Sequence, residues 1–166
     1  MTAILNQLID VLEQSEVMYQ ALLALAEREK AAALGCKHQL LVQVNAEKEA
    51  LLAQLDRNDR RRIDLLHRLA DDMKMSPAQV CLSELESRAD ARQATRLGNL
   101  RSSLSTLVHR IKRANMENRR LIQHCLDLSR SAMCFFQHWM MPAAVYGSSG
   151  RVDSGHRNGK LLSGTV

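Results

Sequence analysis

The sequence contains few of the residues that a compact mixed fold or a disulfide framework needs. Aromatic residues make up 3% of its 166 residues, there are two prolines, and the four cysteines form no C-x-x-C pair. Scattered cysteines of this kind are typical of reduced cytoplasmic thiols. No apolar run approaches the roughly 20 residues of a membrane span, and the N-terminus shows no signal-peptide pattern. We therefore expect a cytoplasmic protein without a membrane span.

The usual arrangements of catalytic and metal-binding residues are also missing. No glycine-rich loop joins a strand to a helix to hold a phosphate. Cys134 and His138 have the i, i+4 spacing of two ligands on one helix, and Cys36 and His38 could add to them across a bundle. Zinc needs three or four ligands, however, and such pairs are common on helices without any metal. We expect no enzyme activity, no cofactor and no metal site.

The sequence does contain a long helical pattern over residues 97–139. Apolar residues recur at alternating intervals of three and four, which places them on one face of a helix. This first stripe is apolar at twelve of its thirteen positions, the exception being Asn118: Leu97, Leu100, Leu104, Leu107, Ile111, Ala114, Asn118, Leu121, Cys125, Leu128, Ala132, Phe135 and Trp139. A period of 3.5 residues over this length predicts a coiled-coil helix that faces a partner helix.

A second stripe runs beside the first at the same spacing and changes from polar to apolar along the helix: Arg101, Ser105, Val108, Lys112, Asn115, Arg119, Ile122, Leu126, Ser129, Met133, Phe136 and Met140. The broad apolar surface that results near the C-terminal end needs either two neighbouring helices or a partner from outside. One interpretation is that the first helix of the chain covers it. The other is a partner-binding surface, for which we predict these residues: Ile122, Leu126, Met133, Phe136, Trp139, Met140 and Met141.

Two further helices are predicted upstream. Apolar spacing places the first at residues 3–33, ending near Gly35, because glycine tolerates the left-handed conformation that closes many helices. The second runs from about 37 to 75. Four polar residues interrupt their apolar faces: Ser15, Lys48, Asn58 and Arg62.

Ser76-Pro77 then marks the start of a short helical connector that leads to the third helix at about 89–141. Short turns make neighbouring helices antiparallel. The sequence therefore predicts an all-α fold, an elongated antiparallel three-helix coiled-coil bundle over residues 1–141. A flexible glycine- and serine-rich tail is predicted over residues 142–166.

The charge is unevenly distributed. The net charge is +5, with −4 on residues 1–56 and +9 on residues 57–166. Such a balance permits a nucleic-acid partner, but the basic residues are spaced along helical faces. That spacing favours a solvated surface together with attraction to the acidic first helix. We expect no nucleic-acid partner.

Residues 114–122, Ala-Asn-Met-Glu-Asn-Arg-Arg-Leu-Ile, resemble the N-x-x-N-x-x-L-I element of the FlgN family of flagellar export chaperones. The segments 145–151 and 159–162 are similar to that family's Y-G-x-x-G tail and its late apolar patch. The residues that carry the resemblance are Asn115, Asn118, Leu121, Tyr146 and Gly147. For Asn118 we expect a role in fixing the register of helices rather than in contacting a client protein.

The resemblance implies an all-helical cytoplasmic chaperone. It would bind the C-terminal helical segments of flagellar hook-associated proteins through its own C-terminal helix and deliver them to the type III export apparatus. The alternative is a structural coiled-coil scaffold, or a homodimer formed through the apolar end of the third helix, without chaperone activity.

Overall fold

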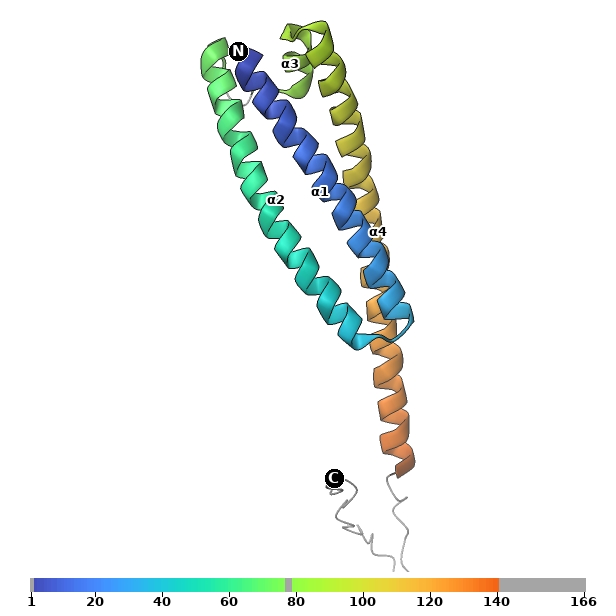
Figure 1. The fold of residues 1–166 in the computed structure, drawn as a ribbon. Coiled ribbons are helices and arrows are strands. Elements are labelled where there is room, and N and C mark those ends of the chain that lie inside the picture. Colours follow the sequence, from blue (N-terminus) through green and yellow to red (C-terminus); the bar gives the residue numbers. More distant parts are fainter. Residues whose placement is uncertain (1, 77–78, 141–166) are drawn as a thin grey trace, which may run out of the picture. The chain divides into compact units, whose positions relative to one another are not determined.

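The computed structural model describes residues 2–76 and 79–140, which form four helices and no strand. These are α1 (Thr2–Leu34), α2 (His38–Met73), α3 (Leu82–Arg88) and α4 (Ala91–Met140), drawn in Figure 1. The all-α prediction is confirmed, and the three long helices end within two residues of the predicted bounds. The chain divides into two compact units, Met1–Gln123 and His124–Val166. The predicted tail at 142–166, with Tyr146 and Gly147, lies outside the described residues.

In the first unit, α1 lies between α2 and α4 (Figure 1). Its pairing with α2 is antiparallel, since Val11 is bonded to Asn58 while Arg28 is bonded to Glu47. Its pairing with α4 is parallel. The side chain of Gln93 at the start of α4 donates to Asn6, and the side chain of Asn118 donates to the backbone oxygen of Ala26. Helix α1 therefore has a neighbour on two sides.

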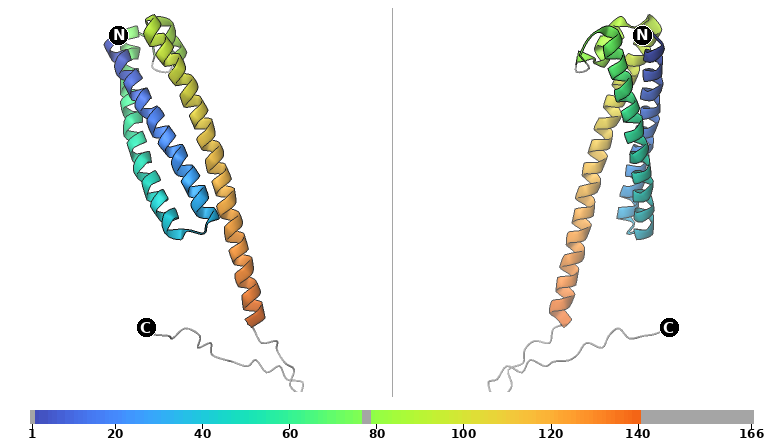
Figure 2. Two further views of the ribbon diagram at one scale, coloured as in Figure 1. Left: turned by 45° about the vertical axis from the view of Figure 1, so that its right-hand side comes forward. Right: turned by 90° about the vertical axis from the view of Figure 1, so that its left-hand side faces the viewer.

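The main hydrophobic core of this unit lies where the start of α1, the end of α2 and the start of α4 come together (Figure 2). Its most deeply buried large side chains come from three helices: Leu5, Leu8, Ile9, Leu69 and Leu97. Leu85 of α3 also belongs to this core, so the short helix is held by an apolar contact. A smaller cluster lies further along α1 and α4 and consists of Leu22, Leu23, Leu107 and Ile111.

Helices α1 and α2 end in the same way, with a residue in the left-handed conformation. These residues are Cys36 (φ 51°) and Lys74 (φ 52°). In both turns the next amide reaches back five residues, from Lys37 to the oxygen of Ala32 and from Met75 to that of Ala70. This is the hydrogen-bond pattern of the Schellman motif. Helix α1 ends next to Gly35 as predicted, but the left-handed residue of the turn is Cys36 and not the glycine.

Helix α4 begins with a side-chain cap. The backbone amide of Gln93 donates a 2.7 Å hydrogen bond to the carboxylate of Asp90. This satisfies one of the free amides of the first turn, and a carboxylate there also suits the positive end of the helix dipole. The cap fixes where the long helix starts.

Candidate partner-binding surface

Two of the polar residues that interrupt the apolar faces of α1 and α2, Ser15 and Asn58, lie opposite one another. Asn58, which is buried, donates through Nδ2 to the backbone oxygen of Val11 (2.9 Å) and to Oγ of Ser15 (2.8 Å). Because a buried amide without a partner is costly, the two polar side chains stabilise one another in a single register. A shift of one residue would take these two acceptors away from the buried amide of Asn58, while Ser15 would keep its 3.0 Å hydrogen bond to the backbone oxygen of Val11.

A second polar layer joins all three long helices. Asn118 is 3% exposed, and its Nδ2 donates to the backbone oxygen of Ala26 (2.7 Å) and to Glu29 (2.8 Å). Lys48 of α2 forms a 2.9 Å ion pair with the same Glu29 oxygen. The geometry supports the register role expected for Asn118, since one carboxylate holds a donor from α2 and a donor from α4.

The other family-motif residues in the described part of the chain are placed differently. Asn115 is exposed and Leu121 is half-buried. The two asparagines of the N-x-x-N element therefore do not form one site, because Asn118 is buried and Asn115 is exposed.

Charged side chains pair across the helices of the first unit. Arg96 of α4 lies 2.6 Å from Glu13 of α1, and Lys30 of α1 lies 3.0 Å from Glu117 of α4. Hydrogen bonds from Arg113 and then Lys30 lower the pKa of Glu117 below its ordinary value. The Arg96–Glu13 pair agrees with the expectation that part of the basic charge is attracted to α1, whereas the Lys30–Glu117 pair has the opposite polarity.

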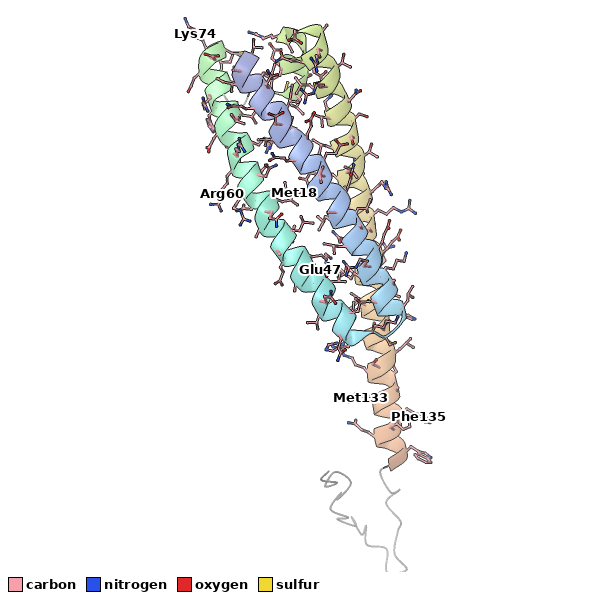
Figure 3. The ribbon with its side chains drawn as sticks, viewed as in Figure 1. Met18, Glu47, Arg60, Lys74, Met133 and Phe135 are labelled. Atoms are coloured by element: carbon pink, nitrogen blue, oxygen red, sulfur yellow. The ribbon has the colours of Figure 1, made fainter. Side chains whose placement is uncertain are left out.

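Glu47 of α2, labelled in Figure 3, forms a similar pair with Arg28 of α1. The hydrogen bond from Arg28 is the main cause of the lowered pKa of this carboxyl group. Helix α1 is thus held to both α2 and α4 by charge as well as by apolar contact.

The second unit has a different surface. Its described part, residues 124–140, belongs to α4, and none of the side chains described there is buried. Six large apolar side chains, here called the α4 apolar face, are exposed: Leu126 (47%), Leu128 (57%), Met133 (63%), Phe135 (68%), Phe136 (56%) and Trp139 (75%). Figure 3 labels Met133 and Phe135 on this segment.

The exposure changes along the first stripe. Leu97 and Leu100 are buried, Leu121 and Cys125 are half-buried, and Leu128 is exposed. The same apolar spacing that packs against α1 in the first unit thus continues through residues 128–139 without being covered. The rings of Phe135 and Phe136 contact each other edge to face, with centroids 6.1 Å apart.

The face is also wide. At about 100° per residue, its side chains together with Cys125 and Ala132 span roughly 180° of the helix surface. Ser129 is the polar residue within this arc, and its hydroxyl donates to the backbone oxygen of Cys125 (2.9 Å). The opposite side carries the polar residues His124, Asp127, Arg130, Ser131 and Gln137.

Four of the predicted partner-binding residues, Leu126, Met133, Phe136 and Trp139, belong to the α4 apolar face. Ile122 is half-buried in the first unit. Met140 is helical, but its side chain lies outside the described residues, as does the whole of Met141. Leu128 and Phe135 were not in the predicted set, although the first stripe contains both.

Within the part of the chain that the structure describes, no group of three or more His, Cys, Asp or Glu residues could hold a metal ion. In the same residues, no helix combines the length and the apolar character needed to cross a membrane. The hollows on the first unit are open grooves along the helices, such as one of about 340 Å³ lined by Tyr19, Leu104 and Val108.

Comparison with known proteins gives one match. A family model described as FlgN protein matches residues 1–154, a range that includes all of the described residues. It contains the segments 114–122 and 145–151 and stops before 159–162. No curated protein and no solved structure matches the chain.

Proposed function

Because the chain belongs to the FlgN family of flagellar chaperones, we propose that it is a cytoplasmic export chaperone for flagellar hook-associated proteins. It binds the C-terminal helical segments of these clients and delivers them to the type III export apparatus while the flagellum is assembled. The role is one of binding and release, without catalysis.

The observation that carries the proposal is the α4 apolar face. Taking about 200 Å² for each ring, the exposed fractions of Phe135, Phe136 and Trp139 amount to roughly 400 Å². Leu126, Leu128 and Met133 add to this area. The largest apolar patch on a typical monomer is about 300–600 Å² and is often functional. A surface of this size on a single helix is suited to an amphipathic helix of a partner.

The chemistry of the face suits a chaperone that receives helical clients. Aromatic rings provide large contact areas at low entropic cost, and the thioether of Met133 adapts to differently shaped neighbours. The polar side of the same helix, with Asp127 and Arg130, stays in water when the apolar side is covered. A client helix can therefore dock without refolding the chaperone.

The first unit serves as the scaffold in this proposal, an elongated bundle in which α2 runs antiparallel to α1 and α4. The two polar layers, centred on Asn58 and Asn118, favour one register of the helices over others. We propose that this register, rather than direct contact with the client, is the role of Asn118.

We propose no nucleic-acid partner. Arg96 and Arg28 are paired with carboxylates of neighbouring helices, which reduces the charge available for phosphates.

Isothermal titration of the full-length chain with the C-terminal segment of a hook-associated protein from the same genome tests the proposal. We expect a one-to-one complex, and a deletion strain should release less hook-associated protein into the medium. If no complex forms and export is unchanged in the deletion strain, the proposed function is wrong.

The same exposed face also favours one other function, a coiled-coil scaffold that forms a homodimer. Light scattering over a range of concentrations separates the two functions. A chain that is monomeric alone and gains the mass of one client is a chaperone, whereas a dimer that persists when the client is added is a scaffold.

A further inference from the structure

We propose that the first unit has a docking surface of its own: the groove between α1, α2 and α4, beside α3, binds an acidic amphipathic helix of a partner protein. The α4 apolar face takes no part in this site, so the inference does not depend on the proposed function. It follows from the side chains that line the groove and from the way α3 packs next to it.

The groove has an apolar floor. Its volume is about 340 Å³, and side chains from all four helices line it. Leu12 is buried there, and four other side chains are half-buried: Tyr19, Leu82, Leu104 and Val108. Covering half-buried apolar side chains is favourable in proportion to the area that is removed from water. The floor therefore favours an occupant with apolar side chains.

The two walls of the groove differ in charge. On the α2 wall, Arg62 is paired with Asp59 of its own helix (2.7 Å), so the two charges balance. On the α4 wall, Lys112 and His109 are exposed, and no carboxylate pairs with Lys112 in the part of the chain that the structure describes. An ammonium group in this position attracts the carboxylates of a partner. The α4 wall therefore favours an acidic occupant.

Helix α3 shows that an acidic amphipathic helix packs on this side of α4. Leu85 of α3 is buried in the main core, and Leu82 lines the groove. Glu86 of α3 lies 3.2 Å from Arg101 of α4. Arg101 and Lys112 belong to the same stripe, about three helical turns apart. The groove next to α3 thus presents the combination of apolar and basic side chains that α4 already presents to α3.

A partner helix of the same character as α3 satisfies both features. Its apolar residues, at spacings of three and four, lie on the floor, and carboxylates along one flank pair with Lys112 as Glu86 pairs with Arg101. Other anionic partners match only the charge. A nucleic acid would place phosphates over the apolar floor, and a flat lipid surface does not enter a groove.

Fluorescence anisotropy of a labelled designed peptide, titrated with the full-length chain, tests the inference. The peptide is helical, with leucines at spacings of three and four and glutamates along one flank, and its control has lysines in place of the glutamates. The variant K112E reverses the charge of the α4 wall. R110E is the matched control, because Arg110 is also exposed on α4 but lines hollows on the other side of this helix.

We expect the glutamate peptide to bind the wild type and R110E equally and to bind K112E about tenfold more weakly. Added salt should weaken binding to the wild type, because the pairs at the edge of the groove are screened. The lysine peptide should bind K112E more tightly than it binds the wild type. The variant F136Q/W139Q, which alters the α4 apolar face, should keep the wild-type affinity for the glutamate peptide.

Four outcomes overturn the inference. They are equal losses in K112E and R110E, a loss of affinity in F136Q/W139Q, equal binding of the two peptides to the wild type, and no binding at millimolar concentration. If vesicles of phosphatidylglycerol bind the wild type but not K112E while the glutamate peptide does not bind, the groove belongs to a membrane-binding surface, and the inference is likewise wrong. None of these outcomes bears on client binding, so the proposed function is tested separately.

Discussion

The α4 apolar face should lose its client when two of its aromatic side chains are replaced. The test is the double variant F136Q/W139Q, because glutamine is a good helix former and keeps α4 intact. The exposed fractions of Phe136 (56%) and Trp139 (75%) correspond to roughly 260 Å² at about 200 Å² per ring. At about 25 cal/mol per Å², burying this area contributes about 6.5 kcal/mol before the costs of association.

The measurable loss is smaller, because side-chain ordering and incomplete burial consume part of this energy. Aromatic residues that dominate interfaces cost about 2–4 kcal/mol on truncation, so the Kd for the client segment should rise about 30- to 1,000-fold. Isothermal titration measures this change. The control V17Q/L52Q removes apolar side chains that are 66% and 50% exposed in the first unit, and its Kd should equal that of the wild type.

Urea unfolding of the same variants completes the test. Since Phe136 and Trp139 are exposed in the free chain, replacing them should change the free energy of unfolding by no more than about 0.5 kcal/mol. Wild-type affinity in the double variant would show that the client binds elsewhere. A loss of several kcal/mol of stability would show that the two rings belong to the core.

Three further predictions concern the first unit. N118A should lower the free energy of unfolding in urea by about 2 kcal/mol, because it removes a buried hydrogen bond to a charged group; unchanged stability would contradict the register role. K74G should raise the melting temperature, by relieving about 1 kcal/mol of left-handed strain. G35A should not raise it, because the added Cβ would lie 3.3 Å from the backbone oxygen of Ala31, and this crowding offsets the gain from a stiffer unfolded chain. Arg113 and Lys30 lower the pKa of Glu117 below its ordinary value of 4.5. The ionised Glu117 side chain therefore contributes fully to stability above pH 4.5, and this contribution is lost as the pH falls through the lowered pKa. E117Q should therefore be less stable than wild type at neutral pH, and the difference should shrink in urea titrations below pH 4.5; a constant difference would contradict this assignment.

The helices could be predicted from sequence because their apolar periods are long and few breakers interrupt them. The left-handed residue in the turn after α1 could not be predicted in this way. Glycine favours that conformation, which indicates Gly35, but the structure has Cys36 there, one position later. A hydrogen-bonded turn can hold a non-glycine residue in the left-handed conformation when the surrounding contacts offset the strain. The cap at Asp90 could have been found, because Gln93 follows it at the spacing of a capping box.

Partners across helices could not be predicted in the same way. The polar positions Ser15, Lys48, Asn58 and Asn118 stood out in the sequence, but which of them meet depends on the crossing and offset of the helices. The spacing along one helix does not contain that information. The burial of Glu29, which joins α2 to α4, could not be predicted, because a glutamate on a charged helix is usually exposed.

The predicted partner-binding surface omitted Leu128 and Phe135 for a related reason. Both continue a stripe whose upstream residues face α1, so the pattern assigned them to helix packing. The position along α4 at which its packing against α1 ends depends on the three-dimensional structure. The exposed fractions of the α4 side chains show this position, whereas the periodicity of the sequence does not.

Hydrogen–deuterium exchange of the full-length chain, with and without the C-terminal segment of a hook-associated protein, tests most directly where the client binds. We predict that the amides of residues 124–140 exchange markedly more slowly in the complex, while those of α2 keep their free rates. Slower exchange in α2 with no change at 124–140 would contradict the account.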